Sequence, residues 1–336
     1  MVAFCTFFDS NYLGRGLTLY RSLEQHCTDF HLWILCLDQN CYEFFQAGEF
    51  QHITPVSLSD FESGNTELAR AKSNRSTIEY YFTCTPCFTE YVIQNNEEIE
   101  LITYLDADLY FYNDPAPIFE ELAHASVGII EHRFPGRMKK LERYGIFNVA
   151  WVSFRRDRDG LACLHRWSEQ CMDWCYDKLE DDRFADQKYL DSWPENFNGV
   201  RVIQHKGANL APWNVANYRI TTQANTVMVD EQALLFFHFH GLKQVAPWPV
   251  YNTSLGENRT ILTAVLRNDV YRPYLQAQFE TQQQWLQHAG EGVELGGVRD
   301  FVNGLWRSES LRSVSRGLVS IYSLLVCRAY MIFRGR

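Results

Sequence analysis

Short apolar runs alternate with amphipathic segments along the first hundred residues. Residues 2–8, 31–37 and 52–58 are apolar runs of the length of a buried strand. Between the first two runs, Leu13, Leu17, Tyr20 and Leu23 recur at helical spacing. This alternation predicts an α/β fold, in which a mixed, mostly parallel sheet is flanked by helices on both faces.

The pattern continues with further strands and helices. Strands are expected at residues 101–105, 127–131, 147–154, 200–203, 227–229 and 234–239, and helical material at residues 67–94 and 161–179. The last two strands are expected to form a hairpin. Residues 132–143 have no clear period and predict a mobile loop over the site.

Beyond residue 257 the sequence becomes helical, rich in glutamine and weakly patterned. We therefore predict one large α/β domain over residues 1–257 and a helical C-terminal region over residues 258–336. The last segment, residues 311–336, contains five arginines and no acidic residue among many apolar side chains. It predicts a basic amphipathic helix that lies peripherally on a membrane, with packing against protein as the alternative.

Composition narrows the class of protein. The chain has 336 residues, of which 46% are hydrophobic, so it can bury a sizeable core. A formal net charge of −10 argues against a nucleic-acid partner, because such proteins present a basic face. Ten scattered cysteines and a start without a signal-peptide pattern predict a cytoplasmic protein. With the basic tail, it would associate peripherally with the inner face of the cytoplasmic membrane.

Two cysteine pairs have spacings that deserve separate interpretation. Cys84 and Cys87 have the spacing of a redox motif, but they lie inside a predicted helix and not at a strand-to-helix turn. Cys171 and Cys175 are four residues apart on a predicted helix, without a second pair at zinc-site spacing nearby in the sequence. We interpret both pairs as packing residues.

Two carboxylates end the apolar run at residues 101–105. Asp106 and Asp108 stand one residue apart where this strand becomes a loop. Ligands gather beyond the carboxyl ends of strands in open α/β sheets. Two carboxylates there can bind Mg²⁺ or Mn²⁺ and leave coordination positions open for phosphate oxygens. An ordinary solvated turn is the alternative.

Other polar groups are expected at the same edge. Asp9 to Tyr12 follow the first strand, where they contact a nucleotide or simply cap the next helix. A basic cluster containing Arg75 precedes the helix that leads to the strand at residues 101–105. His238 and His240 are two residues apart on a predicted strand and so share one face. Residues 205–218 are dense in Gly, Pro, Asn and Trp, which suits a sugar-binding wall.

Five short segments together resemble a known family. They are Asp9-Ser10-Asn11-Tyr12, Tyr104-Leu105-Asp106-Ala107-Asp108, Phe147-Asn148-Val149-Ala150, Asp186-Gln187 and His238-Phe239-His240-Gly241, with Lys243, Pro247 and Trp248 behind the last. In this order the chain is similar to GT-A fold, Rossmann-like glycosyltransferases over roughly residues 1–250. It is nearest to the glycogenin-like and lipopolysaccharide galactosyltransferase (family 8-like) group and looks like a bacterial branch associated with surface polysaccharides.

The resemblance implies a set of functional residues. Asp106, Asp108 and His238 would bind Mn²⁺ or Mg²⁺, with His240 as the alternative to His238. The donor would be a nucleotide-diphospho-sugar, with a UDP-sugar preferred, contacted by Thr6, Asp9, Asn11, Tyr12, Arg75, Ala107 and Lys243. Asn148, Asp186 and Gln187 would hold donor-sugar hydroxyls, with Gln187 near the reactive carbon. Lys243 departs from the family because three residues separate it from the Pro-Trp pair.

The implied reaction is the metal-dependent transfer of a hexose, with retention, to a hydroxyl of a glycan or lipid-linked acceptor. Two other interpretations use the same residues. One is a non-catalytic module that binds sugar nucleotides or glycans. The other is a phosphotransferase that uses the first aspartate of Asp-x-Asp as a nucleophile, although such enzymes place the motif on the first strand.

Overall fold

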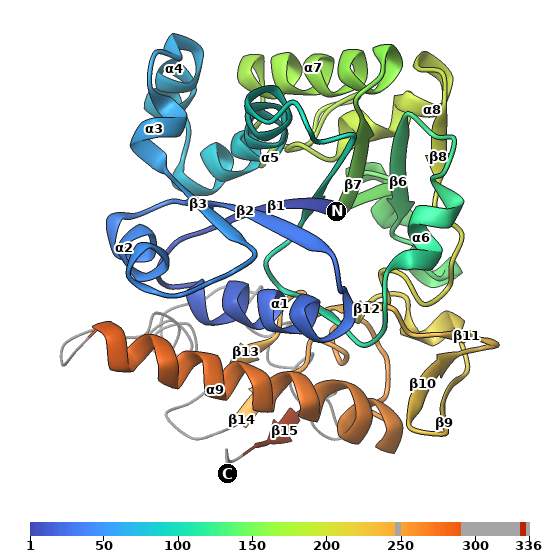
Figure 1. The fold of residues 1–336 in the computed structure, drawn as a ribbon. Coiled ribbons are helices and arrows are strands. Elements are labelled where there is room, and N and C mark those ends of the chain that lie inside the picture. Colours follow the sequence, from blue (N-terminus) through green and yellow to red (C-terminus); the bar gives the residue numbers. More distant parts are fainter. Residues whose placement is uncertain (246–249, 290–329, 334–336) are drawn as a thin grey trace, which may run out of the picture.

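The computed structural model describes residues 1–245, 250–289 and 330–333. Its centre is a seven-stranded sheet in the order β3-β2-β1-β4-β7-β6-β8 (Figure 1). The strands are β1 (Val2–Phe8), β2 (Phe30–Cys36), β3 (Ile53–Ser57), β4 (Leu101–Leu105), β6 (Val127–Glu131), β7 (Phe147–Arg155) and β8 (Val200–Val202). Only β7 runs antiparallel to its neighbours in this sheet, so the predicted mixed, mostly parallel sheet is confirmed.

Helices cover both faces of the sheet. Their bounds are α1 (Leu13–His26), α2 (Gln39–Ala47), α3 (Leu58–Glu62), α4 (Thr66–Asn74), α5 (Thr77–Asn95), α6 (Ala116–Glu121), α7 (Arg158–Asp173), α8 (Trp193–Asn196) and α9 (Arg272–Ala289). Figure 1 shows α5 and α7 on one face and α1 with α9 on the other. Burial on both sides explains why β4 and β7 are almost continuously apolar.

Local sequence sets the helix boundaries. Ser76 and Glu79 form a capping box at the start of α5, and Asp157 caps α7 by accepting a hydrogen bond from the Gly160 amide. The latter helix ends at Asp173, six residues before the predicted boundary at residue 179. The segment predicted as a mobile loop contains a 3₁₀ helix, η1 (Gly136–Tyr144), with three further short turns at η2 (Lys188–Ser192), η3 (Val215–Asn217) and the π-helical η4 (Leu266–Tyr271).

The predicted hairpin of residues 227–229 and 234–239 is wrong. The strand β10 (Thr226–Val229) pairs with β9 (Ile220–Gln223) and β11 (Gln232–Ala233). The next strand, β12 (Phe236–His238), instead pairs antiparallel with β5 (Leu109–Phe111), which directly follows Asp108. All residues of β12 are buried, so this strand requires a partner inside the core, whereas no residue of β9 is buried.

The first part of the predicted C-terminal region packs into the main core. Thr281 of α9 hydrogen-bonds Thr18 of α1 at 2.8 Å between their hydroxyl oxygens. Trp285 is only 2% exposed, and its ring lies 5.5 Å from the Phe44 ring of α2. Nearer the start of α9, Tyr274 stacks on Phe239 with ring centroids 3.7 Å apart. The helix is therefore an integral layer of the α/β fold.

Part of the predicted amphipathic tail is a strand. β15 (Tyr330–Ile332) pairs antiparallel with β14 (Val250–Asn252), which also pairs with β13 (Lys243–Gln244). Met331 and Phe333 are buried in the cluster that contains Tyr274, so the membrane-helix prediction is wrong for these residues. Residues 311–329 and 334–336 of the predicted tail lie outside the described residues. Within the described residues, no helix has the length and apolarity needed to cross a bilayer.

We predict that Trp285→Ala lowers the free energy of unfolding of the whole domain by about 3–5 kcal/mol, because it removes a large buried ring from the shared core. Urea denaturation followed by circular dichroism measures this change. Gln283→Ala, an exposed position on the same helix, is the control and is expected to change stability by less than about 0.5 kcal/mol. A main transition that Trp285→Ala leaves unaltered would show that α9 is a separate unit.

Candidate active site

A cavity of about 590 Å³ lies where β1 and β4 end, beside the start of the antiparallel strand β7. This is the edge at which α/β sheets bind ligands. The predicted site residues that line it are Asp9, Tyr12, Asp106, Ala107, Asp108, Asn148, Asp186, Gln187, His238 and His240. The fold thus brings together groups from five separate segments of the chain.

The predicted metal ligands converge at one end of this cavity. Pairing of β5 with β12 sets Leu109 opposite His238, and this register carries the imidazole to the Asp-x-Asp segment. The His238 Nε2 atom lies 3.0 Å from Asp108 Oδ1 and 3.7 Å from Asp106 Oδ2. Donor atoms of Asp108, His238 and His240 lie within 4.8 Å of one another, so both histidines stand at the site.

Burial and mutual charge separate the acidities of these groups. Burial raises the pKa of Asp106 to about 6, against the opposing attraction of His238. Burial also disfavours ionisation of Asp108, but the charge and hydrogen bond of His238 outweigh it and hold that pKa well below the usual value. Burial opposes protonation of His238, yet Asp108 raises its pKa, whereas burial lowers the pKa of His240. Asp108 is thus the anionic centre of the cluster.

The donor set fits a divalent cation. Two carboxylates and one or two imidazoles offer the oxygen and nitrogen ligands that Mn²⁺ accepts, and the carboxylates alone suit Mg²⁺. His238 Nε2 and Asp108 Oδ1 lie 3.0 Å apart, and both atoms can turn a lone pair to a metal when the imidazole carries no proton on Nε2. Asp106, hydrogen-bonded by the Tyr104 hydroxyl at 3.0 Å, completes the set.

Amide and carboxyl groups form the adjoining wall. Asp186 is 4% exposed, and burial with the nearby charge of Asp106 raises its pKa to about 7, although a hydrogen bond from Thr85 opposes the shift. The Gln187 side-chain amide donates to the carbonyl of Tyr144 at 3.0 Å, which ties it to η1. These polar groups can donate and accept hydrogen bonds along a sugar ring.

A hydrogen bond to His132 sets the orientation of the Asn148 side chain. The ring Nδ1 of His132 lies 3.2 Å from the Ile146 carbonyl, which can only accept, so Nδ1 carries the proton. Burial lowers the pKa of this histidine to about 3, which keeps the ring neutral. Its Nε2 therefore accepts from the Asn148 amide nitrogen at 3.2 Å. The Asn148 carbonyl oxygen faces the other way, where the Ala150 amide donates to it at 3.4 Å.

Aromatic side chains line the opposite part of the cavity. Phe7 lies 6.2 Å from Tyr81 and 5.8 Å from Tyr104 between ring centroids, and Phe82 and Ile78 of α5 also face the space. Flat apolar rings of this kind favour a planar heterocycle. The sequence predicts a helix here but does not place its first turns at the site, because aromatic residues at helical spacing usually indicate core.

Four predicted donor contacts do not line the cavity. Arg75 donates to the carbonyls of Cys171 and Met172 at 2.6 and 2.7 Å, so it binds the C-terminal end of α7, where backbone carbonyls attract a cation. The expectation that it faces the diphosphate is therefore not met. Thr6 is fully buried, Asn11 is exposed and bonds Asp9 at 3.3 Å, and Lys243 is exposed on β13. Pro247 and Trp248 lie outside the described residues.

The segment predicted as a sugar-binding wall lies behind the histidines. Asn209 and Asn214 are fully buried. The Trp213 ring packs edge-on against His238 and His240 at 5.2 and 5.5 Å, and its indole nitrogen donates to the His132 carbonyl at 2.8 Å. Trp213 thus packs against both imidazoles, while His238 Nε2 lies toward the carboxylates.

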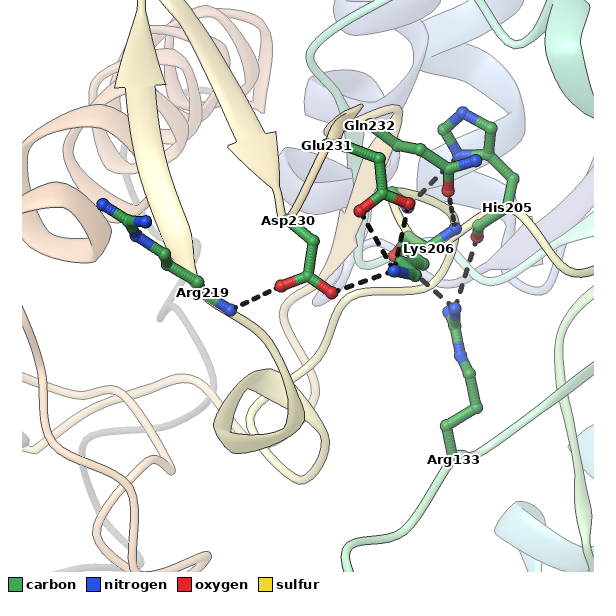
Figure 2. A network of polar contacts seen from close by, with 8 residues as sticks. Arg133, His205, Lys206, Arg219, Asp230, Glu231 and Gln232 are labelled. Carbon is green, nitrogen blue, oxygen red and sulfur yellow. Dashed lines mark hydrogen bonds and ion pairs between the residues drawn. The ribbon is translucent and has the colours of Figure 1, made fainter.

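A charged network holds the start of that segment (Figure 2). Lys206 lies 3.0 Å from both Asp230 and Glu231, and its backbone amide donates to Gln232 at 2.6 Å. Arg133 donates to the carbonyl of His205 at 3.3 Å. The network therefore ties the approach to Trp213 to the β9–β11 sheet and to the loop after β6.

Two contributors were missed at the sequence level. Tyr104 shares a strand face with Asp106, two residues on, and Arg15 follows Tyr12 by three residues at the start of α1. A spacing of two along a strand and of three along a helix puts side chains on one face, so both residues could have been predicted near the site. The cysteine pairs are free, buried thiols in the core between α5 and α7, as the packing interpretation expected.

Among solved structures, the chain resembles the galactosyltransferase LgtC in complex with donor and acceptor sugar analogs, at 18% identity and a TM-score of 0.48, over 71% of this chain and 87% of that one. It also resembles mouse xyloside xylosyltransferase 1, at 12% identity and a TM-score of 0.46, over 71% and 98%.

No protein-family model matches the chain. Two relatives from Bacillus subtilis are close in sequence. The uncharacterized protein YfnD is 36% identical over 245 residues, which is 72% of this chain and 78% of YfnD. The uncharacterized protein YfnF is 33% identical over 252 residues, which is 73% of this chain and 82% of YfnF. At this level of identity and coverage, the chain belongs to the same protein family as YfnD and YfnF.

Proposed function

We propose that this protein is a metal-dependent GT-A glycosyltransferase. It moves a hexose from a nucleotide-diphospho-sugar, preferably a UDP-sugar, to a hydroxyl of a glycan or lipid-linked acceptor. The observation that carries the proposal is the convergence of Asp106, Asp108 and His238 in a cavity that has aromatic rings on one side and amides on the other. Its volume of about 590 Å³ falls in the usual range for small-molecule sites.

Asp106, Asp108 and His238 or His240 would hold Mn²⁺ or Mg²⁺. The bound cation would supply positive charge that stabilises the leaving diphosphate. Different side chains of the site would then contact different parts of the donor. Tyr12 and the aromatic rings of β1 and α5 suit the base, and Asp9 suits the ribose.

Asn148, Asp186 and Gln187 are proposed to orient the donor sugar. A carboxyl group whose pKa is near 7 is partly protonated at neutral pH, so Asp186 can donate as well as accept a hydrogen bond. The proposed retention follows from the sequence resemblance. In this chemistry the enzyme contributes mainly positioning and charge stabilisation, and the departing diphosphate can accept the acceptor's proton.

The proposed setting is bacterial surface polysaccharide synthesis, which rests on the motif resemblance. The cytoplasmic location stays a prediction from the sequence.

A thermal-shift screen with UDP-, GDP-, CMP- and dTDP-sugars in the presence of Mn²⁺ tests the donor. A ligand that binds only the native state at 100 times its Kd adds about 2.7 kcal/mol to stability, so the correct nucleotide raises the melting temperature by several degrees. No shift with any nucleotide sugar in the presence of Mn²⁺ would contradict the proposal.

We predict that Asp108→Asn abolishes Mn²⁺-dependent hydrolysis of the donor, because it removes the anionic centre of the metal site. Release of free sugar is measured with the donor identified above. Glu97→Gln is the matched control, since Glu97 is exposed just before the same strand β4 and should leave hydrolysis unchanged. Equal activity of Asp108→Asn and wild type would remove Asp108 from the mechanism.

We also predict that Gln187→Ala lowers kcat at least roughly tenfold while UDP affinity changes less than roughly twofold. Gln187 is expected near the reacting carbon and away from the base, so its contacts act mainly in the transition state. Turnover and UDP titration by calorimetry give the two numbers. Comparable losses in both would assign Gln187 to nucleotide binding instead.

A further inference from the structure

Arg15 stands behind the cavity wall, on the first turn of α1. Its Nη1 atom donates to the Tyr12 hydroxyl oxygen at 2.7 Å, and the guanidinium carbon lies 4.6 Å from the centre of the Tyr12 ring. Its Nη2 atom donates to the Leu242 carbonyl at 2.5 Å. One side chain therefore contacts both the nucleotide wall and the loop that follows the histidines.

The contact with Tyr12 has a fixed direction. A guanidinium group has only donors, so the Tyr12 oxygen must accept from Arg15. The hydroxyl hydrogen of Tyr12 is then free to point at Asp108, whose Oδ2 atom lies 3.4 Å away. The hydrogen bonds therefore run in one direction, from Arg15 to the Tyr12 oxygen and from the Tyr12 hydroxyl to Asp108 Oδ2. This leaves Asp108 Oδ1 for His238.

The contact with Leu242 restrains the other half of the site. Leu242 closes a turn whose amide donates to the Phe239 carbonyl at 3.1 Å, and this turn carries His240 and Gly241. Gly241 has a φ of +71°, a conformation that few other residues adopt, so the turn is specified by sequence. Arg15 thus links the carboxylate segment and the histidine segment, which are remote in the chain.

We propose that Arg15 is a positioning residue for the metal site, which it assembles by holding Asp108 through Tyr12 and the His240 turn through Leu242. This inference rests on the proposed function. Lysine cannot replace it, because one ammonium nitrogen cannot reach two acceptors that a planar guanidinium bonds with separate nitrogens. Groups that orient metal ligands usually change metal affinity by about 10–100-fold when removed.

The test is Mn²⁺ binding by isothermal titration calorimetry on the purified full chain, with Arg15→Lys and Arg15→Met. Both variants are expected to bind Mn²⁺ at least roughly tenfold more weakly than wild type. Arg21→Met is the matched control. Arg21 lies on the same helix in a surface ion pair with Glu24, and its variant is expected to bind Mn²⁺ as wild type does. Circular dichroism melting verifies that each variant is folded.

Tyr12→Phe keeps the ring and removes the hydroxyl that links Arg15 to Asp108. It is expected to weaken Mn²⁺ binding, and its effect should be less than additive with Arg15→Met, because both interrupt the same chain. Folded Arg15 variants with wild-type affinity overturn the inference. If neither Arg15 variant folds, wild-type affinity in Tyr12→Phe overturns it and weaker binding supports it. Wild-type protein that binds no Mn²⁺, either alone or in the presence of UDP, overturns the proposed function itself.

Discussion

The pairing of β5 with β12 is the interaction on which the site depends. β5 begins one residue after Asp108, and β12 ends at His238, so the register of three residue pairs decides whether the imidazole meets the carboxylates. Because side chains alternate along a strand, a slip by one residue would turn His238 to the opposite face and bring Phe237 to the carboxylates. The buried phenylalanines of β12 prevent that slip, since it would place a polar ring in the core. Packing of the interior therefore sets the chemistry at its edge.

The electrostatics of the cavity follow from this enforced proximity. Asp9, Asp106, Asp108 and Asp186 all line one space, which makes it a poor place for a bare diphosphate. Under the proposed function, a cation would have to enter before or together with the anionic donor. The raised pKa values of Asp106 and Asp186 have the same origin, because buried carboxyl groups near one another resist full ionisation. A cation held by these carboxylates could attract an anionic donor, so no basic surface is needed elsewhere on the chain.

Much of the fold was predictable because apolar runs and helical spacing report burial directly. The seven strands of the central sheet, and the placement of Asp106 and Asp108 at its edge, followed from those patterns. Long-range pairing did not, since the sequence around residues 227–239 suits a local hairpin as well as it suits β12 against β5. Arg75 shows a second limit, because a basic residue satisfies a helix end and a phosphate by the same chemistry. The Asn209 to Asn214 segment shows a third, since Trp and Asn suit a sugar surface and also a buried polar scaffold.

The stacking of Tyr274 on Phe239 links the C-terminal helix to the strand end that presents the histidines. Phe239 lies between His238 and His240 in the chain, so α9 supports the edge that presents the two histidines. For protein engineering, a cut at residue 257 would separate Phe239 from the aromatic ring that stacks on it. A chimera that exchanges only the C-terminal region must supply an equivalent aromatic ring beneath the histidines, and recombination between relatives is expected to preserve α9 together with the strand that it supports.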